Sequence, residues 1–103
     1  ELSQMAKVIR KIVIEIPKEI DWILRVDGHT DKTKFLNEGK FKDNWELSQA
    51  RALSVVKYFI LNENLPAKRF AATGFGEFQP IDTGDSEIAL ARNRRIEIKL
   101  TER

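Results

Sequence analysis

The chain contains no cysteine, three prolines, five glycines and a single histidine, His29. The absence of cysteine excludes disulfide bonds and thiolate metal sites. A zinc site needs three or four ligands. His29 is the only histidine, and the nearby carboxylates of Asp27 and Asp31 are too few and too close together in the sequence to complete such a site. No apolar run approaches the ~20 residues of a membrane-spanning helix, and we expect no signal peptide within this sequence. We therefore expect no metal and no cofactor.

The charges are nearly balanced, with 18 basic and 16 acidic residues and a net charge of +2. This balance gives no indication of nucleic-acid binding. Hydrophobic residues make up 42% and charged residues 33% of the chain, as in an ordinary soluble globular protein. A length of 103 residues indicates one domain, residues 1–103. Because the chain begins with Glu1 rather than Met, we expect it to be part of a longer protein.

The spacing of apolar residues predicts six elements in the order helix, strand, helix, strand, short helix, strand. Pro17 ends the first helix, Gly28 ends the first strand, and Asp43 or Asn44 caps the second helix. Asp85 or Ser86 caps the short helix. The expected elements span residues 2–16, 21–26, 45–62, 69–73, 86–93 and 94–101. This order predicts an α/β (α+β) two-layer sandwich with helices on one face of a small sheet.

A long connection, residues 32–43, separates the first strand from the second helix. It contains Gly39 and several lysines. Connections of this length in compact domains are often functional, and a solvated surface insertion is the alternative. Both interpretations stay open.

Arg51 and Asp31 carry the clearest chemical signal. On a helical wheel, Arg51 falls in the row of Leu47, Val55 and Tyr58, so we expect it inside the apolar stripe, where a guanidinium needs a partner. Asp31, at the end of the preceding strand, could supply that partner. The two groups could form a structural ion pair. They could also bind a zwitterion, with Asp31 holding an ammonium and Arg51 a carboxylate.

Three arginines, Arg92, Arg94 and Arg95, lie where the last strand begins. They could be a solvated strand end or an anion site. The alternation of Ile96, Ile98 and Leu100 places Arg94 on the inner face and Arg95 on the surface. His29 is expected to be a turn residue that hydrogen-bonds the backbone.

These residues fall into motifs that resemble the OmpA-like C-terminal domain, which is found in outer-membrane proteins, peptidoglycan-associated lipoproteins and MotB-type flagellar stator subunits. The resemblance runs from about Leu2 to the end of the chain and keeps the order of the motifs. The motifs are Gly28-His29-Thr30-Asp31, Asn44-x-x-Leu47-Ser48-x-x-Arg51-Ala52, Gly74-Phe75-Gly76-Glu77-x-x-Pro80 and Asn93-Arg94-Arg95-Ile96-Glu97-Ile98. Asn44-Trp45-Glu46-Leu47-Ser48 is closest to the stator-like branch.

The resemblance implies a βαβαβ-type domain that binds peptidoglycan non-covalently through the diaminopimelate end of the stem peptide. Asp31 would hold the ammonium and Arg51 the carboxylate. Gly28 would permit the turn and His29 would be structural. The other residues implied to line the pocket are Thr30, Asn44, Leu47 and Arg94. The chain lacks the usual first strand with its Phe-Asp signature, so part of the groove and one sheet edge are expected to be open.

The resemblance further implies a periplasmic module that anchors an envelope protein to the cell wall, tethered to the inner or outer membrane by a segment outside this sequence. A homodimer is compatible with it. The alternative is a periplasmic interaction or dimerisation domain that has lost wall binding. An enzyme is not expected, because paired catalytic carboxylates are not visible in the sequence.

Overall fold

The computed structural model describes residues 1–33 and 40–103. Its elements follow the predicted order, and the α+β class is confirmed. They are α1 (Leu2–Val13), β1 (Trp22–His29), α2 (Asn44–Glu63), the 3-10 helix η1 (Ala67–Arg69), β2 (Phe70–Gly74), α3 (Glu87–Asn93) and β3 (Arg95–Glu102). None of the helices in this described part is long and apolar enough to cross a membrane.

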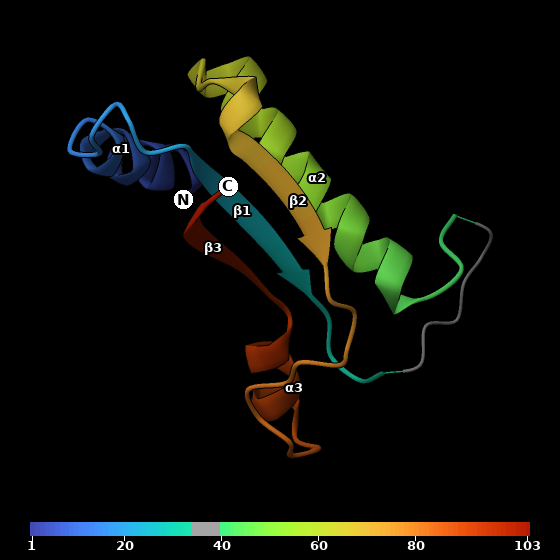
Figure 1. The fold of residues 1–103 in the computed structure, drawn as a ribbon. Helices are drawn as coiled ribbons and strands as arrows, with labels where there is room; N and C mark the ends of the chain where they lie inside the picture. Colours follow the sequence, from blue (N-terminus) through green and yellow to red (C-terminus); the bar gives the residue numbers. More distant parts are fainter. Residues whose placement is uncertain (34–39) are drawn as a thin grey trace.

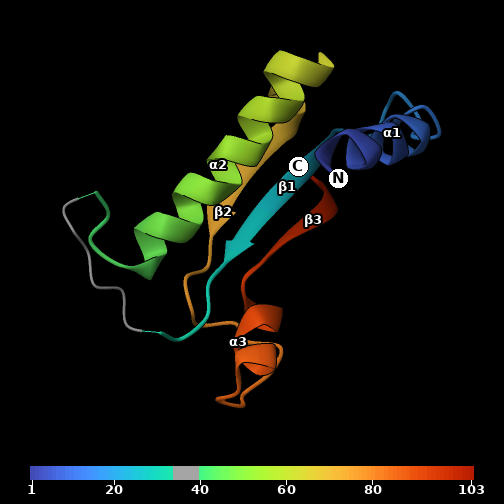
Figure 2. The same ribbon diagram turned by 180° about the vertical axis from the view of Figure 1, so that it is seen from behind.

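The described sheet has three strands in the order β2–β1–β3. β1 pairs with β2 in parallel and with β3 antiparallel. Helix α2 lies along β1 and β2, whereas α1 lies at one end of the sheet and α3 at the other (Figure 1 and Figure 2). Both termini lie at the α1 end. Because β1 and β2 are parallel, their carboxyl ends lie at the same end of the sheet, near the beginning of α2 (Figure 1).

The core lies on the helix side of the sheet, as expected for a two-layer sandwich. Trp22, Leu24 and Val26 alternate along β1 and point toward the helices. One buried cluster joins α1, β1 and α2 and contains Ala6, Ile9, Trp22, Leu24 and Phe59. A second contains Val26, Ala52 and Val56.

Helix α2 begins as the sequence predicts. The carboxylate of Asp43 accepts a hydrogen bond from the backbone N–H of Glu46 at 3.0 Å, which satisfies one of the free donors of the first turn. Glu46 in turn accepts from the backbone N–H of Lys42 at 3.0 Å. Asn64, in the left-handed conformation, ends the helix.

Two predicted boundaries were wrong. Helix α1 ends at Val13, and the backbone N–H groups of Glu15 and Ile16 bond to carbonyls three residues earlier, so the chain tightens into turns before Pro17. Strand β1 does not end at Gly28 but continues through it to His29, because both Gly28 and His29 pair with β3. Part of the long connection, residues 34–39, lies outside the described residues.

Candidate functional site

Two glycines let α2 approach the sheet closely at the edge that carries the site. Gly28 of β1 and Gly74 of β2 are register partners. A Cβ atom at Gly28 would lie 2.3 Å from the backbone oxygen of Ser48, and one at Gly74 would lie 2.5 Å from the backbone nitrogen of Gln49. Gly28 was expected to permit a turn. Instead it lies within β1, and its lack of a side chain allows α2 to pack closely on the sheet.

Ser48 and Gln49 complete this contact with hydrogen bonds. The Ser48 hydroxyl accepts from the backbone N–H of Gly76 at 2.9 Å. The Gln49 side chain accepts from the backbone N–H of Gly74 at 2.8 Å and donates to the carbonyl of Ala72 at 3.1 Å. These bonds fix the first turns of α2 relative to β2.

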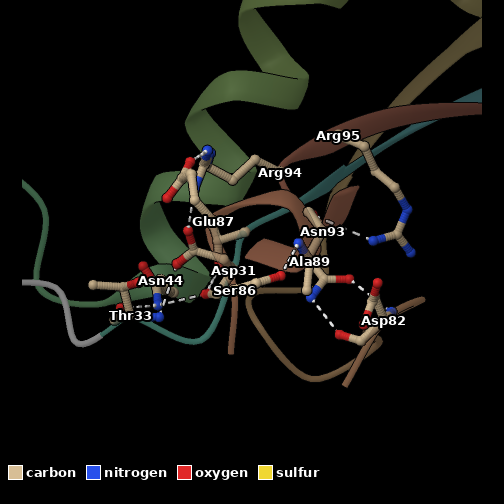
Figure 3. Close-up of polar contacts among 11 residues, drawn as sticks. Asp31, Thr33, Asn44, Asp82, Ser86, Glu87, Ala89, Asn93, Arg94 and Arg95 are labelled. Carbon is tan, nitrogen blue, oxygen red and sulfur yellow. Dashed lines mark hydrogen bonds and ion pairs between the residues drawn. The ribbon is translucent and has the colours of Figure 1, made fainter. Parts of the chain in front are cut away.

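Asp31 is the buried centre of the site, with 8% of its surface exposed. Its Oδ2 accepts from Nη1 of Arg94 at 2.6 Å, and its Oδ1 accepts from the backbone N–H of Thr33 at 2.8 Å (Figure 3). Burial by itself would raise the pKa of Asp31, but the bonds from Arg94 and Thr33 together outweigh it and hold the pKa below its usual value. The carboxylate is therefore ionised at neutral pH.

Arg94, which follows α3, is shared between two carboxylates. Besides Asp31, its guanidinium binds Glu87 at the beginning of α3. Figure 3 shows Arg94 bonded to both Glu87 and Asp31. One positive and two negative side chains leave this cluster with a net negative charge, which favours a cation.

Asn44, the first residue of α2, is buried beside Asp31. Its side-chain amide donates to Oε1 of Glu77 at 2.9 Å and to the carbonyl of Thr33 at 3.3 Å. Thr30 is also buried, and its backbone N–H donates to the carbonyl of Gly76 at 2.9 Å. The network joins the ends of β1 and β2 to the N-terminus of α2.

Arg51 does not occupy the position that the helical wheel predicts. The buried stripe of α2 consists of Asn44, Ser48, Ala52, Val56 and Phe59. Arg51 lies beside this stripe and is exposed, and it forms no hydrogen bond or ion pair with the residues that the structure describes. The expected structural ion pair between Asp31 and Arg51 is therefore wrong: Arg94 takes that place. Leu47, in the same row, is half-buried.

Arg95 differs from its predicted surface position. Its side chain is only 16% exposed. It pairs with Glu97 and donates to the carbonyl of Gln79 at 2.9 Å. Neighbouring Asn93 is buried and holds the loop after β2 by accepting from the backbone N–H of Ile81 at 2.8 Å. Both residues position the loop rather than line the site.

His29 is not the backbone-bonded turn residue that we expected. It lies in β1 on the sheet face opposite α2, and its ring stacks on Phe75 with centroids 5.0 Å apart. Both ring nitrogens are buried without a hydrogen-bond partner in the described structure. Burial, and to a smaller degree the charge of Arg95, lower the pKa of His29.

Asp27 and Glu97 come close to His29, a grouping that the sequence did not reveal. One potential metal-ligand atom from each residue lies within 4.8 Å of the others. However, Arg25 binds Asp27 at 2.7 Å, while Arg95 and Lys99 bind Glu97. A metal ion there would have to displace these cations, so the cluster is better described as an ion-pair network.

Sequence reasoning missed two acidic residues, Glu77 and Glu87. Glu77 belongs to the Gly74-Phe75-Gly76-Glu77 motif, which was recognised without giving this residue a role. The only sequence feature that marks Glu87 is its position as an acidic residue in the first turn of α3. Their contacts depend on long-range folding, because Asn44 meets Glu77 across 33 positions of sequence.

Comparison with known proteins gives a consistent result. A family model described as the OmpA family matches residues 1–94. Motility protein B of Bacillus subtilis is 34% identical over 103 aligned positions, covering 92% of this chain and 39% of that protein. The peptidoglycan-associated lipoprotein of Pseudomonas aeruginosa is 34% identical over 74 positions, covering 72% of this chain and 40% of that protein. The chain thus spans about two fifths of each relative.

A solved structure shares the fold. The cell wall anchor of the type VI secretion system (T6SS) from Pseudomonas aeruginosa superposes with a TM-score of 0.77 and 32% sequence identity. The alignment covers 98% of this chain and 63% of that one. The family model, the relatives and the shared fold agree, and the chain belongs to the OmpA family.

Proposed function

We propose that this chain is a peptidoglycan-binding module that attaches an envelope protein to the cell wall through the diaminopimelate end of the stem peptide. Two of its relatives are described by name as a peptidoglycan-associated lipoprotein and a cell wall anchor. The proposal places the chain in the periplasm, as part of a protein with a membrane tether. It describes a binding module and not an enzyme.

The observation that carries this proposal is the contrast between Asp31 and Arg51. Asp31 is an ionised, buried carboxylate in a cluster of net negative charge. Each carboxylate oxygen has two lone pairs, so Asp31 can accept a further bond from an ammonium beside those of Arg94 and Thr33. Arg51 has no partner among the described residues and is exposed, so its guanidinium is available for two parallel bonds to a carboxylate.

The first two turns of α2 separate Arg51 from the Asp31 network. Arg51 lies seven positions after Asn44 on α2, which corresponds to about 10 Å along the helix at ~1.5 Å per residue. Asn44 in turn bonds the carbonyl of Asp31 at 3.5 Å. In this proposal Thr30, Asn44, Leu47 and Arg94 line the pocket, with Arg94 holding Asp31 in place.

Co-sedimentation with purified diaminopimelate-type sacculi tests the proposal. We expect wild type to pellet with sacculi and Arg51→Ala to remain in solution. Arg51 has no structural partner among the described residues, so its variant should unfold at the wild-type denaturant concentration. Lys57→Ala, which removes another exposed cation from α2, is the matched control and should pellet like wild type.

Asp31→Ala should also lose binding, but it removes the partner of Arg94 and must first be shown to fold. Failure of wild type to pellet would overturn the proposal, as would sedimentation of Arg51→Ala at the wild-type level.

A second candidate function is protein association. Between α1 and β3 lies an open apolar groove with a volume of about 430 Å³. Val8, Ile12 and Leu100 line it and are each about half exposed. A homodimer formed through this groove would appear as a concentration-dependent mass in analytical ultracentrifugation, and Val8→Asp would abolish it without changing sacculus binding.

A further inference from the structure

Two large aromatic side chains are exposed beside the site. Trp45 at the beginning of α2 is 50% exposed and Phe78 in the loop after β2 is 55% exposed. Their rings stack with centroids 4.9 Å apart and planes inclined by 28°. Neither ring belongs to the two buried clusters. Exposed aromatic pairs of this kind are costly to hydrate and often mark binding surfaces.

The local backbone holds this pair in place. Gly76 has a φ of +65°, a conformation that glycine adopts readily. A Cβ atom at Gly76 would lie 3.2 Å from Cδ2 of Phe78 and 3.5 Å from Cδ2 of Trp45, so the main chain itself supports both rings. The loop after β2 therefore leaves both rings exposed, while the hydrogen bond from Gly76 to Ser48 holds the backbone next to them.

The pair is continuous with the pocket proposed for the stem peptide. Trp45 follows Asn44, and Phe78 follows Glu77. The bond between Asn44 and Glu77, 2.9 Å long, therefore ties together the two segments that carry the rings. The two residues that carry the rings are therefore direct sequence neighbours of two members of the Asp31 network.

A shallow hollow extends from Trp45 along α2 to the edge of β2. It has a volume of about 600 Å³, with Phe41, Trp45 and Leu53 supplying apolar surface. Lys40, Glu46 and Gln49 supply polar groups around it. An apolar floor with a polar rim suits a pyranose ring, which has C–H groups on its faces and hydroxyl or acetamido groups at its edge.

We propose that Trp45, which stacks on Phe78 and lines this hollow, forms a platform for an N-acetylated amino sugar of the glycan strand. The inference rests on the proposed peptidoglycan binding and adds the sugar as a second recognised part of the polymer. On the helical wheel Trp45 lies about a third of a turn around α2 from Asn44 and Arg51. The sugar and the peptide end would thus occupy different flanks of a helix ~10 Å wide. A stem of three residues can extend about 10 Å and so reach across it.

Calorimetric titration with two ligands tests the platform. The first ligand is a tripeptide stem ending in diaminopimelate, and the second is the same stem attached to its N-acetylglucosaminyl–N-acetylmuramyl disaccharide. Wild type should bind the second about tenfold more tightly than the first, equivalent to the stacking of one ring. Trp45→Ala should remove this difference and leave the affinity for the peptide within about twofold.

Two further variants make the result specific. Trp45→Tyr keeps a ring and should retain most of the difference. Leu61→Ala removes an exposed apolar side chain from the far end of α2 and should behave as wild type. Each variant is checked for folding by circular dichroism.

Every outcome decides between the two proposals. Equal binding of both ligands by wild type would overturn the platform and keep the peptide site, and so would an equal loss of both ligands in Trp45→Ala. Binding of the disaccharide ligand alone, abolished by Trp45→Ala, would support the platform and overturn the peptide site. Binding of neither ligand would overturn both.

Discussion

The two longest helices, α1 and α2, contact the sheet in different ways. Helix α2 meets β1 and β2 at Gly28 and Gly74, where backbone lies against backbone and no side chain separates the elements. Helix α1 meets the sheet through apolar side chains and leaves an open groove next to β3. The site is built at the α2 contact.

The difference indicates how a small domain can fix the positions of the candidate-site residues. A contact between backbones permits little sliding, so Asn44, Trp45 and Arg51 on α2 have defined positions relative to Asp31 after β1. The α1 contact consists of partly exposed side chains that can repack. We therefore expect changes at the α2 contact to affect stability and binding together, and changes in the α1 groove to affect neither strongly.

The largest effect is expected from Gly28→Ala. The new Cβ would lie 2.3 Å from the backbone oxygen of Ser48, which cannot rotate away as a flexible side chain would. We expect a loss of about 3 kcal/mol or more in the free energy of unfolding, measured by urea denaturation. Gly84→Ala is the control: its Cβ would meet Asp82 Oδ1 at 3.2 Å and should cost less than about 1 kcal/mol. Equal losses in the two variants would contradict the close α2 contact.

Arg94→Ala should have an intermediate effect. It leaves the buried carboxylate of Asp31 without its cation, and we expect a loss of about 1–2 kcal/mol at pH 7, limited by the partial exposure of Arg94. The pKa of Asp31 should rise, as measured by NMR titration. Arg92→Ala, which breaks an exposed pair with Asp82, should cost less than about 0.5 kcal/mol. An unchanged Asp31 pKa in Arg94→Ala would show that Arg94 does not hold this carboxylate.

The ionisation of Asp31 should also make the free energy of unfolding decrease at acid pH. Its pKa is lower in the folded chain than in the unfolded chain, so its contribution is present above the unfolded pKa, about 3.9, and is lost as the pH falls below that value. Urea denaturation between pH 5 and pH 2 measures this loss. Asp31→Asn should lose less stability than wild type over this range, and parallel pH profiles would contradict the assignment.

His29→Phe should have a smaller, pH-dependent effect. Phenylalanine keeps the stacking on Phe75 and removes two buried nitrogens that have no partner among the described residues. The pKa of His29 is lowered by folding, so wild type should lose stability as the pH falls below about 6.5. The variant should lack this loss and exceed wild type by about 1 kcal/mol at pH 5. A steeper pH dependence in the variant would refute this.

The smallest effect is expected from Val8→Thr in the α1 groove. Val8 is 55% exposed, and substitutions at such positions usually change stability by less than about 0.5 kcal/mol. Urea denaturation should give a midpoint close to that of wild type. A loss of 2 kcal/mol or more would mean that the groove is a packed interface and would remove the contrast between the two helices.

The order of elements and the positions of Thr30, Asp31 and Asn44 followed from the sequence, because apolar spacing and turn residues are local signals. The partner of Asp31 could not be predicted in the same way. The sequence pointed only to Arg51 as this partner, whereas Arg94 was expected to line the pocket, and the actual pairing depends on how α3 packs against the end of β1. The helical wheel placed Arg51 in the apolar stripe because its row also contains Leu47 and Val55. The glycine contact turned the stripe of Ser48 and Ala52 toward the sheet instead.

The joint role of Asp31 and Arg51 is tested most directly by an NMR titration of the isotope-labelled chain with the stem peptide that ends in diaminopimelate. We expect the side-chain signals of Arg51 Nε and Asn44 Nδ2 to shift together with the backbone signals around Asp31, and Arg51→Ala to abolish these shifts. Shifts confined to the α1 groove or to the His29 face of the sheet, with Arg51 and Asn44 unmoved, would contradict this joint role.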